Sequence, residues 1–182
     1  MTIDSDKILH DLLNSLDSLE GIRPGEIPNI ALYMDQVTTF MDAQLASSRR
    51  FESDKVLTKT MINNYAKNKL LPPPVKKKYS RVHLASLIII CILKQSLSIS
   101  DIQRMFPQDH SEEAIHKLYD DFVEQYRKVF GAFARQIQAT DEVLIEGGSA
   151  LITSAAVISS LSKDLTEFLL GCGETADRTE KA

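Results

Sequence analysis

The chain has 182 residues, of which 43% are apolar, so it can hold one domain or two small ones, each with a hydrophobic core. Its net charge of −4, taken as an average, argues mildly against a nucleic-acid partner. The charge is uneven, however. Residues 49–81 carry ten Lys and Arg against Glu52 and Asp54, a local charge of +8, which leaves −12 on the remainder. Charge alone does not decide whether this basic segment binds a partner or is only solvated.

The sequence predicts a cytoplasmic protein without a membrane segment. Cys91 and Cys172 lie far apart and fit neither a disulfide nor a metal-binding pattern, and Cys91 is expected to be a buried small hydrophobe. Residues 1–13 are acidic and lack the basic-then-apolar plan of a signal peptide. The longest apolar run, residues 84–93, has about half the length that a membrane-spanning helix needs.

Two helices are expected before the basic segment. Residues 6–19 have a wide apolar stripe typical of an amphipathic helix, and we assign residues 1–27 to an N-terminal arm and a Gly/Pro connector. Residues 29–46 predict a second helix, capped by Asn29. Its apolar side comprises Ile30, Tyr33, Met34, Val37, Phe40, Met41 and Leu45. Residues 47–54 are polar and turn-like.

Residues 57–81 predict a short helix, a rigid corner and a basic ribbon. Thr58 can cap a helix over residues 58–71, because apolar residues recur there at three- and four-residue steps. Pro72, Pro73 and Pro74 end it. Residues 75–79 predict either a small two-stranded wing or an irregular loop. With the helix before it, this stretch follows a helix-turn-helix plan, although its loop is longer than the usual turn.

The remaining chain is predicted to be helical. Residues 81–96, capped by Ser80, are apolar on nearly all sides and predict the central core helix. A short helix follows at 97–106, capped by Ser98 or Ser100 and ended by Pro107. Residues 111–138, starting at Ser111, and residues 149–170 predict two long helices, and residues 171–182 a disordered tail. The two long helices form either a hairpin over the domain's own core or a module for dimerisation or ligand sensing, of which we favour dimerisation.

Residues 56–74 and 76–103 resemble the DNA-binding domain of the mercury-resistance regulator (MerR) family. Leu57, Thr58, Ile62 and Tyr65 match the recognition helix of that family, Leu70, Leu71 and Pro72 match the phrase after it, and Tyr79 matches the tyrosine that closes its wing. Two positions depart from the pattern, since Asn63 stands where that family has arginine and Lys69 where it has glycine. The resemblance implies a winged helix-turn-helix over residues 28–108, followed by a C-terminal helical module over residues 109–170.

The chain from Pro28 onward also resembles a bacterial family, domain of unknown function 1836. The resemblance is carried by PNIALYMDQVTTFMD and LTKTMINNYAKNKLLPPPVKKKYSR. It implies a helix-turn-helix regulator without a defined biochemistry.

The sequence offers no convincing catalytic or metal site. His10, His83, His110 and His116 are scattered, and the last two are off the four-residue step that places two ligands on one helix face. Neither a phosphate-binding loop nor a nucleophile elbow is present in the sequence. We therefore expect no enzyme activity, no cofactor and no bound metal.

The sequence as a whole favours an all-α, dimeric, DNA-binding transcription regulator, with a recognition helix (58–70) and a basic wing (75–81). Lysines would neutralise phosphates, while asparagine and threonine side chains would meet base edges. Two alternatives stay open: a protein-interaction adaptor of helix-turn-helix shape, and a small-molecule sensor with a pocket in the C-terminal helices. The predicted contacts to double-stranded DNA are Thr58, Lys59, Thr60, Asn63, Asn64, Tyr65, Lys67, Lys76, Lys77, Lys78, Tyr79 and Arg81.

Overall fold

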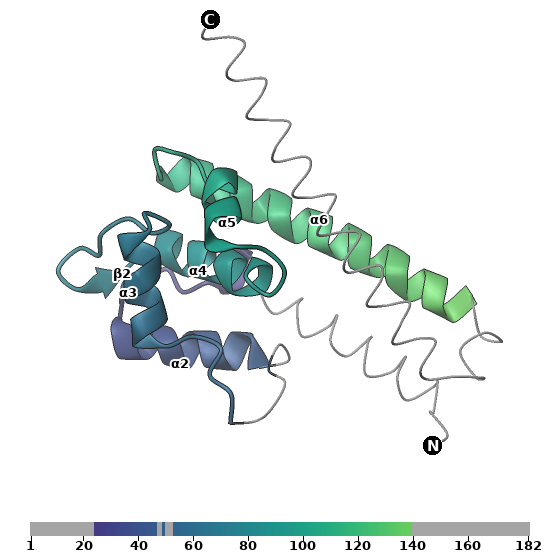
Figure 1. Ribbon diagram of the computed structural model, residues 1–182, viewed down its shortest axis with the longest axis horizontal. Helices are drawn as coiled ribbons and strands as arrows, with labels where there is room; N and C mark the ends of the chain where they lie inside the picture. Colours follow the sequence, from purple (N-terminus) through teal and green to yellow (C-terminus); the bar gives the residue numbers. More distant parts are fainter. Residues whose placement is uncertain (1–23, 47–48, 50–52, 140–182) are drawn as a thin grey trace, which may run out of the picture.

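The computed structural model describes residues 24–46, 49 and 53–139, and these form a mostly helical body with one small sheet (Figure 1). The helical prediction is confirmed, and the sheet is an addition to it. The expected helices at 6–19 and 149–170 and the expected tail at 171–182 lie outside the described residues. The elements are a 3-10 turn η1 (Pro24–Glu26), β1 (Leu32–Tyr33), α2 (Met34–Gln44), α3 (Lys59–Lys67), β2 (Lys78–Tyr79), α4 (Arg81–Leu93), α5 (Ile99–Met105) and α6 (Glu112–Ala139).

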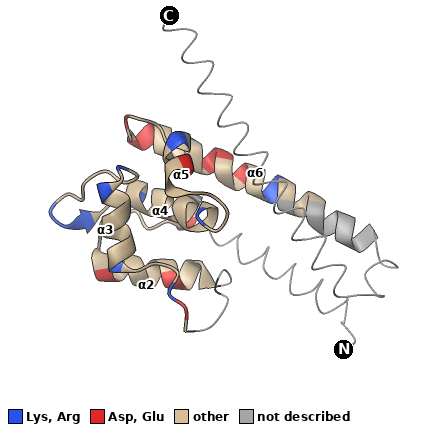
Figure 2. Ribbon diagram, in the orientation of Figure 1, with Lys and Arg blue, Asp and Glu red and all other residues tan. Residues whose placement is uncertain are grey.

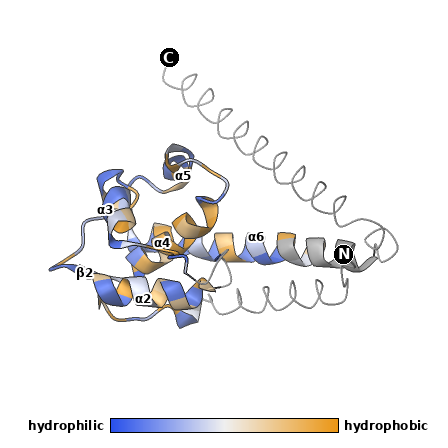
Figure 3. Ribbon diagram, turned by 60° about the horizontal axis from the view of Figure 1, so that its bottom comes forward, coloured by the Kyte–Doolittle hydropathy of each residue, from blue (hydrophilic) through white to orange (hydrophobic). Residues whose placement is uncertain are grey.

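Helix α4 is the centre of the core, as its sequence predicts. All its residues from Val82 to Cys91 are buried, and Figure 3 shows its ribbon, coloured as hydrophobic, with α2, α3 and α5 around it. It ends at Leu93, slightly before the expected residue 96. Burial raises the pKa of the Cys91 thiol to about 11, in keeping with the predicted inert, buried cysteine. The buried side chains around α4 include Val37 and Met41 from α2, Ile62 and Tyr65 from α3, Ile102 from α5, and Ile115 and Tyr119 from α6.

The start of the first core helix differs from the prediction. Helix α2 begins at Met34 rather than at residue 29, and Tyr33, not Asn29, occupies the N-cap position. Leu32 and Tyr33 instead pair as β1 with Tyr79 and Lys78 of β2. The Tyr33 N–H donates to the Gln36 side chain at 2.9 Å, which satisfies an amide at the helix start. Ile30 and Tyr33, expected on the apolar side, are therefore 68% and 53% exposed.

Helix α3 is shorter than predicted because a backbone turn closes it early. The predicted Thr58 cap is present, since the Met61 N–H donates to the Thr58 hydroxyl at 3.2 Å. At the other end the Lys69 N–H donates to the Ala66 carbonyl at 3.1 Å, and the Leu70 N–H to the Tyr65 carbonyl at 2.9 Å. This pair of bonds is the Schellman motif, which ends a helix with one residue in the left-handed region. That residue is Lys69, with a φ of 56°.

Residues 75–79 form a tight hairpin, one of the two alternatives left open. The Lys78 N–H donates to the Val75 carbonyl at 2.9 Å, and the two residues between them turn the chain. Lys76 and Lys77 have φ values of 50° and 64°, and two positive φ angles are typical of a type I′ turn. Because β2 also pairs with β1, the hairpin is anchored to the segment just before α2.

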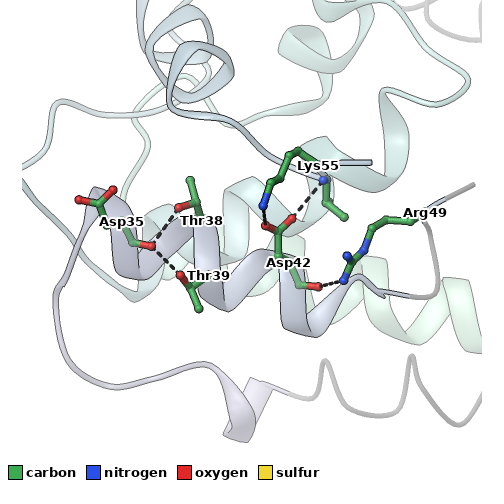
Figure 4. Close-up of polar contacts among 7 residues, drawn as sticks. Asp35, Thr38, Thr39, Asp42, Arg49 and Lys55 are labelled. Atoms are coloured by element: carbon green, nitrogen blue, oxygen red, sulfur yellow. Dashed lines mark hydrogen bonds and ion pairs between the residues drawn. The ribbon is translucent and has the colours of Figure 1, made fainter. Parts of the chain in front are cut away.

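The long loop between α2 and α3 is fastened to α2 by Asp42. Its carboxylate accepts from the Val56 N–H at 3.1 Å and lies 3.6 Å from the Lys55 ammonium group. Its backbone carbonyl accepts from the Arg49 guanidinium at 2.7 Å, as Figure 4 shows. Lys94 of α4 donates to the Val56 carbonyl at 3.2 Å. The end of the loop is thus held from two helices, which fixes where α3 begins.

Helix α6 shares the core with the preceding helices. It starts as predicted, with the Ala114 N–H donating to the Ser111 hydroxyl at 3.3 Å. Ile115 and Tyr119 are buried, and Phe122 packs against the same cluster. The expected boundary between residues 108 and 109 therefore does not coincide with a break in the core. Farther along, α6 extends past the other described helices (Figure 1).

Candidate nucleic-acid interface

The outer face of α3 is polar and exposed. Ile62 and Tyr65 point into the core, whereas Lys59, Thr60, Asn63, Asn64 and Lys67 are exposed on the opposite side. An α-helix with its side chains is about 10–12 Å across, which fits the major groove of DNA, about 12 Å wide. Lys59 is ion-paired with Asp35 at the start of α2, and this contact links α3 to α2.

Three of the predicted contact residues have structural roles within the fold. The Thr58 hydroxyl is engaged with the Met61 amide. Tyr65 and Tyr79 are each only 5% exposed, and burial raises the pKa of Tyr65 to about 12. These tyrosines fill the core behind α3 and β2, so neither ring is available to a ligand on the surface. Arg81, the first residue of α4, is half-buried.

The hairpin presents unpaired positive charge. Lys76 and Lys77 are exposed at its tip, and neither has an ion-pair partner within the described part of the chain. The Lys78 ammonium group lies 5.0 Å from the centroid of the Tyr33 ring, a cation–π contact across the β1–β2 pair. A side chain that can approach a phosphate without first breaking an ion pair is favoured as a contact.

Basic side chains predominate on α3 and the hairpin, whereas acidic side chains outnumber Lys117, Arg127 and Lys128 on the described part of α6. Figure 2 shows Lys and Arg at the hairpin and on α3, and several Asp and Glu along α6. The acidic residues of α6 among the described side chains are Glu112, Glu113, Asp120, Asp121 and Glu124. The separation gives the α3–hairpin surface a local field that the overall charge conceals.

A buried histidine fixes the hairpin relative to α3 and α4. Nδ1 of His83 accepts from the Ser80 N–H at 3.0 Å, and Nε2 lies 3.1 Å from the Pro72 carbonyl, to which it donates. The ring also meets Tyr79 edge-on, with centroids 5.4 Å apart. Burial lowers the pKa of His83, which keeps the imidazole neutral and preserves both bonds. The proline corner is thereby tied to the first turn of α4.

Three functional or positioning residues were missed by the sequence analysis. Tyr33 was assigned to the core because a helix was expected from residue 29, yet it is exposed beside Lys78. No local sequence pattern indicates the role of Asp42, because the Val56 amide that it binds lies fourteen residues farther along the chain. His83 stood in the apolar helix as an isolated histidine. Its place three residues after Ser80 is the spacing of a capping box, which could have identified it.

The described residues show neither a metal centre nor a membrane span. Among them, three or more His, Cys, Asp or Glu side chains nowhere gather as a metal site would require. None of the helices described is both long and apolar enough to span a bilayer.

Comparison with known protein families decides the classification. The model of domain of unknown function 1836 matches residues 22–122. The chain belongs to this family. The predicted membership is thereby confirmed, and the matched region runs from before β1 to Phe122 on α6, so the family domain includes the part of α6 that packs on the core. Comparisons with curated proteins and with solved structures find no match.

Proposed function

We propose that the protein is a cytoplasmic transcription regulator that binds double-stranded DNA through a winged helix-turn-helix of the MerR type. Helices α2 and α3 form the helix-turn-helix, and residues 75–81 form the wing. The observation that carries the proposal is the exposed polar face of α3 beside a hairpin whose two tip lysines have no ion-pair partner in the described chain. In this arrangement α3 enters the major groove and Lys76 and Lys77 neutralise flanking phosphates.

The turn after α3 supports the resemblance to the MerR pattern. That pattern has glycine at the position of Lys69, and Lys69 has the positive φ that glycine adopts most easily. The backbone therefore has the conformation that the pattern requires, despite the different side chain. The arginine of the pattern is replaced by Asn63, which is exposed and can pair with adenine in two hydrogen bonds.

The strained turn at the wing tip also favours a role for its charges. Type I′ turns prefer Asn-Gly or Gly-Gly, because positive φ angles cost a residue with a β-carbon about 1 kcal/mol or more. Here both central residues are lysines, Lys76 and Lys77. Two unfavourable conformations that place two charges at an exposed tip are typical of a binding surface.

We further propose that the regulator is a homodimer formed through the C-terminal helices. A two-fold DNA site needs two copies of the reading helix. Helix α6 spans 28 residues, about 42 Å, and its first half fills the core. Farther along, Val129 is 69% exposed on the helix that leaves the body. An apolar side chain in that place favours contact with a second copy.

The proposal is tested by measuring how DNA affinity depends on salt. Fragments of the genome that encodes the protein are bound by the full chain at several salt concentrations, and Lys76→Gly/Lys77→Gly is compared with the wild type. Glycine removes two charges and suits the positive φ angles, so the hairpin is kept. The log–log salt slope is expected to become shallower by about 1.8, because each phosphate contact contributes about 0.9.

A charge-matched control lies on α6. Lys117→Gln/Lys128→Gln also removes two positive charges, from exposed positions on the acidic helix, and is expected to leave the slope unchanged. Asn63→Ala/Asn64→Ala tests base recognition, and should reduce sequence preference while leaving the slope intact. Absence of any sequence preference, together with equal slopes for the wild type and the wing variant, would refute DNA binding and favour the adaptor alternative.

A further inference from the structure

An apolar pocket lies between the end of α3, the proline corner and the link from α5 to α6. Its volume is about 530 Å³, within the range that small-molecule sites occupy. Leu71, the three prolines Pro72–Pro74, Phe106 and Pro107 supply most of its lining. The rigid proline rings and the planar Phe106 ring suit a flat apolar ligand, because little side-chain freedom is lost when it binds.

Some polar groups that line the pocket have a hydrogen-bond or ion-pair partner among the described residues, and others do not. Lys69 lines it and has no ion-pair partner among the described residues. His110 lines it too, and its Nδ1 atom is buried without a hydrogen-bond partner in the described chain. Asp109, the acidic residue of the lining, already accepts from the Ser111 N–H at 3.2 Å. The exposed Lys69 ammonium group is therefore the lining group that favours an anionic partner, whereas the buried Nδ1 atom of His110 is closed off from a ligand in the pocket.

The same two residues have unusual backbone conformations. Lys69 and His110 have φ values of 56° and 47°, in the left-handed region. Such conformations cluster at ligand sites, where the surrounding structure holds a side chain in place at some cost in stability. Both residues flank the apolar lining, so backbone strain and unsatisfied polar groups coincide at one pocket.

We propose that this pocket binds a small molecule with a flat apolar body and one carboxylate. The body packs on the proline rings and Phe106, and the carboxylate meets the Lys69 ammonium group. The walls come from α3, from the root of the wing and from the residues just before α6. A molecule held there touches the DNA-reading elements on one side and the start of α6 on the other, so its binding is linked to DNA affinity. The linkage, but not the binding itself, rests on the proposed function.

The binding is tested on the full chain by equilibrium dialysis with 2-naphthoate. The neutral 2-naphthylmethanol, of nearly the same shape, serves as the second probe. Lys69→Gly removes the ammonium group at a position whose φ suits glycine, so the fold is kept. It is expected to weaken 2-naphthoate binding about three- to fivefold, as for loss of one partly exposed ion pair, and to leave 2-naphthylmethanol unaffected.

Lys77→Gly is the matched control. It makes the same replacement at another positive-φ lysine, at the wing tip and outside the pocket, and should leave the binding of both probes unchanged. Ala66→Phe, which places a bulky ring in the pocket lining, should abolish binding of both. The proposal is overturned if 2-naphthoate shows no saturable binding at about millimolar concentration. It is equally overturned if Lys69→Gly and Ala66→Phe bind 2-naphthoate as the wild type does.

DNA affinity measured with and without saturating 2-naphthoate tests the linkage. We expect the two affinities to differ by severalfold in the wild type and to be equal in Ala66→Phe. Equal affinities in the wild type would refute the linkage. If no DNA binds at all, the proposed function fails, and the dialysis result alone decides whether the pocket is a ligand site.

Discussion

At the scale of single residues, backbone strain coincides with the candidate sites. The residues with a positive φ in the described chain, glycine excepted, are Lys69, Lys76, Lys77 and His110. Two form the wing tip and two line the pocket behind it. Local helix caps at Thr58, Ser98 and Ser111 could be predicted, because their side chains bond amides three residues away. The strained lysines could not, because local rules assign such conformations to glycine and only the tertiary structure imposes them here.

Replacing Lys69 with glycine is expected to stabilise the protein. Lys69 has the left-handed position of the turn that ends α3, where a β-carbon costs about 1–2 kcal/mol. Glycine loses more freedom on folding, which offsets about half of the gain, so the free energy of unfolding should rise by about 0.5–1 kcal/mol. Urea titration measures the change.

The same replacement two residues earlier is expected to destabilise the protein. Lys67 is the last residue of α3 and is exposed, so Lys67→Gly should lower the free energy of unfolding by up to about 1 kcal/mol. If both variants were destabilised equally, the Lys69 backbone would not be strained in the folded protein.

At the scale of elements, local pattern explains the helices, and distant pairing explains where they start. Helix α4 and the start of α6 follow from apolar content and capping residues, and both were predicted closely. The predicted start of α2 was wrong, because Leu32 and Tyr33 pair with β2, which lies far along the chain. No local signal at residues 29–33 indicates that partner. In the same way the wing depends on His83, whose ring joins the Pro72 carbonyl to the Ser80 amide.

The role of His83 predicts a loss of stability in mild acid. Unfolding releases the ring to its ordinary pKa of 6.5, whereas burial lowers the pKa in the folded protein. Between these two pKa values the unfolded chain binds more protons, so the free energy of unfolding falls as the pH drops below about 6.5. A proton on Nδ1 would also remove the acceptor of the Ser80 N–H.

The variant His83→Gln isolates this effect. Glutamine suits the same position of a capping box and can accept from the Ser80 amide, but it does not titrate. Urea midpoints are compared between about pH 8 and pH 5, and the stability advantage of the wild type should shrink toward the acid end. Carboxylates titrate in both proteins and cancel in the difference. Parallel curves would show that His83 keeps its ordinary pKa.

At the scale of the whole molecule, basic side chains concentrate on the α3–hairpin surface, while α6 is predominantly acidic among its described side chains. The sequence predicted the basic part, because the charge of +8 on residues 49–81 against −12 on the remainder is visible in it. The sequence predicted less well how far the core extends along α6. The apolar stripe of this helix is continuous, so its pattern is the same whether the core or a partner covers it. The structure assigns Ile115 and Tyr119 to the core, and the family match ends at Phe122. Beyond that point Val129 is exposed, and this exposure is what the proposed dimer contact rests on.

The proposed dimer is tested at Val129, because it is exposed on the part of α6 that leaves the body. Sedimentation equilibrium of the full chain should show a dimer whose dissociation constant rises at least tenfold in Val129→Lys, since burying an unpaired ammonium group costs more than about 1.4 kcal/mol. The control Glu124→Lys also places a lysine on α6, but on the face opposite the apolar stripe, where it removes an exposed ion pair with Lys128. It should leave the dimer intact. A monomeric wild type, or equal weakening by both lysines, would remove α6 from the interface. DNA binding would then have to be explained with a single reading helix.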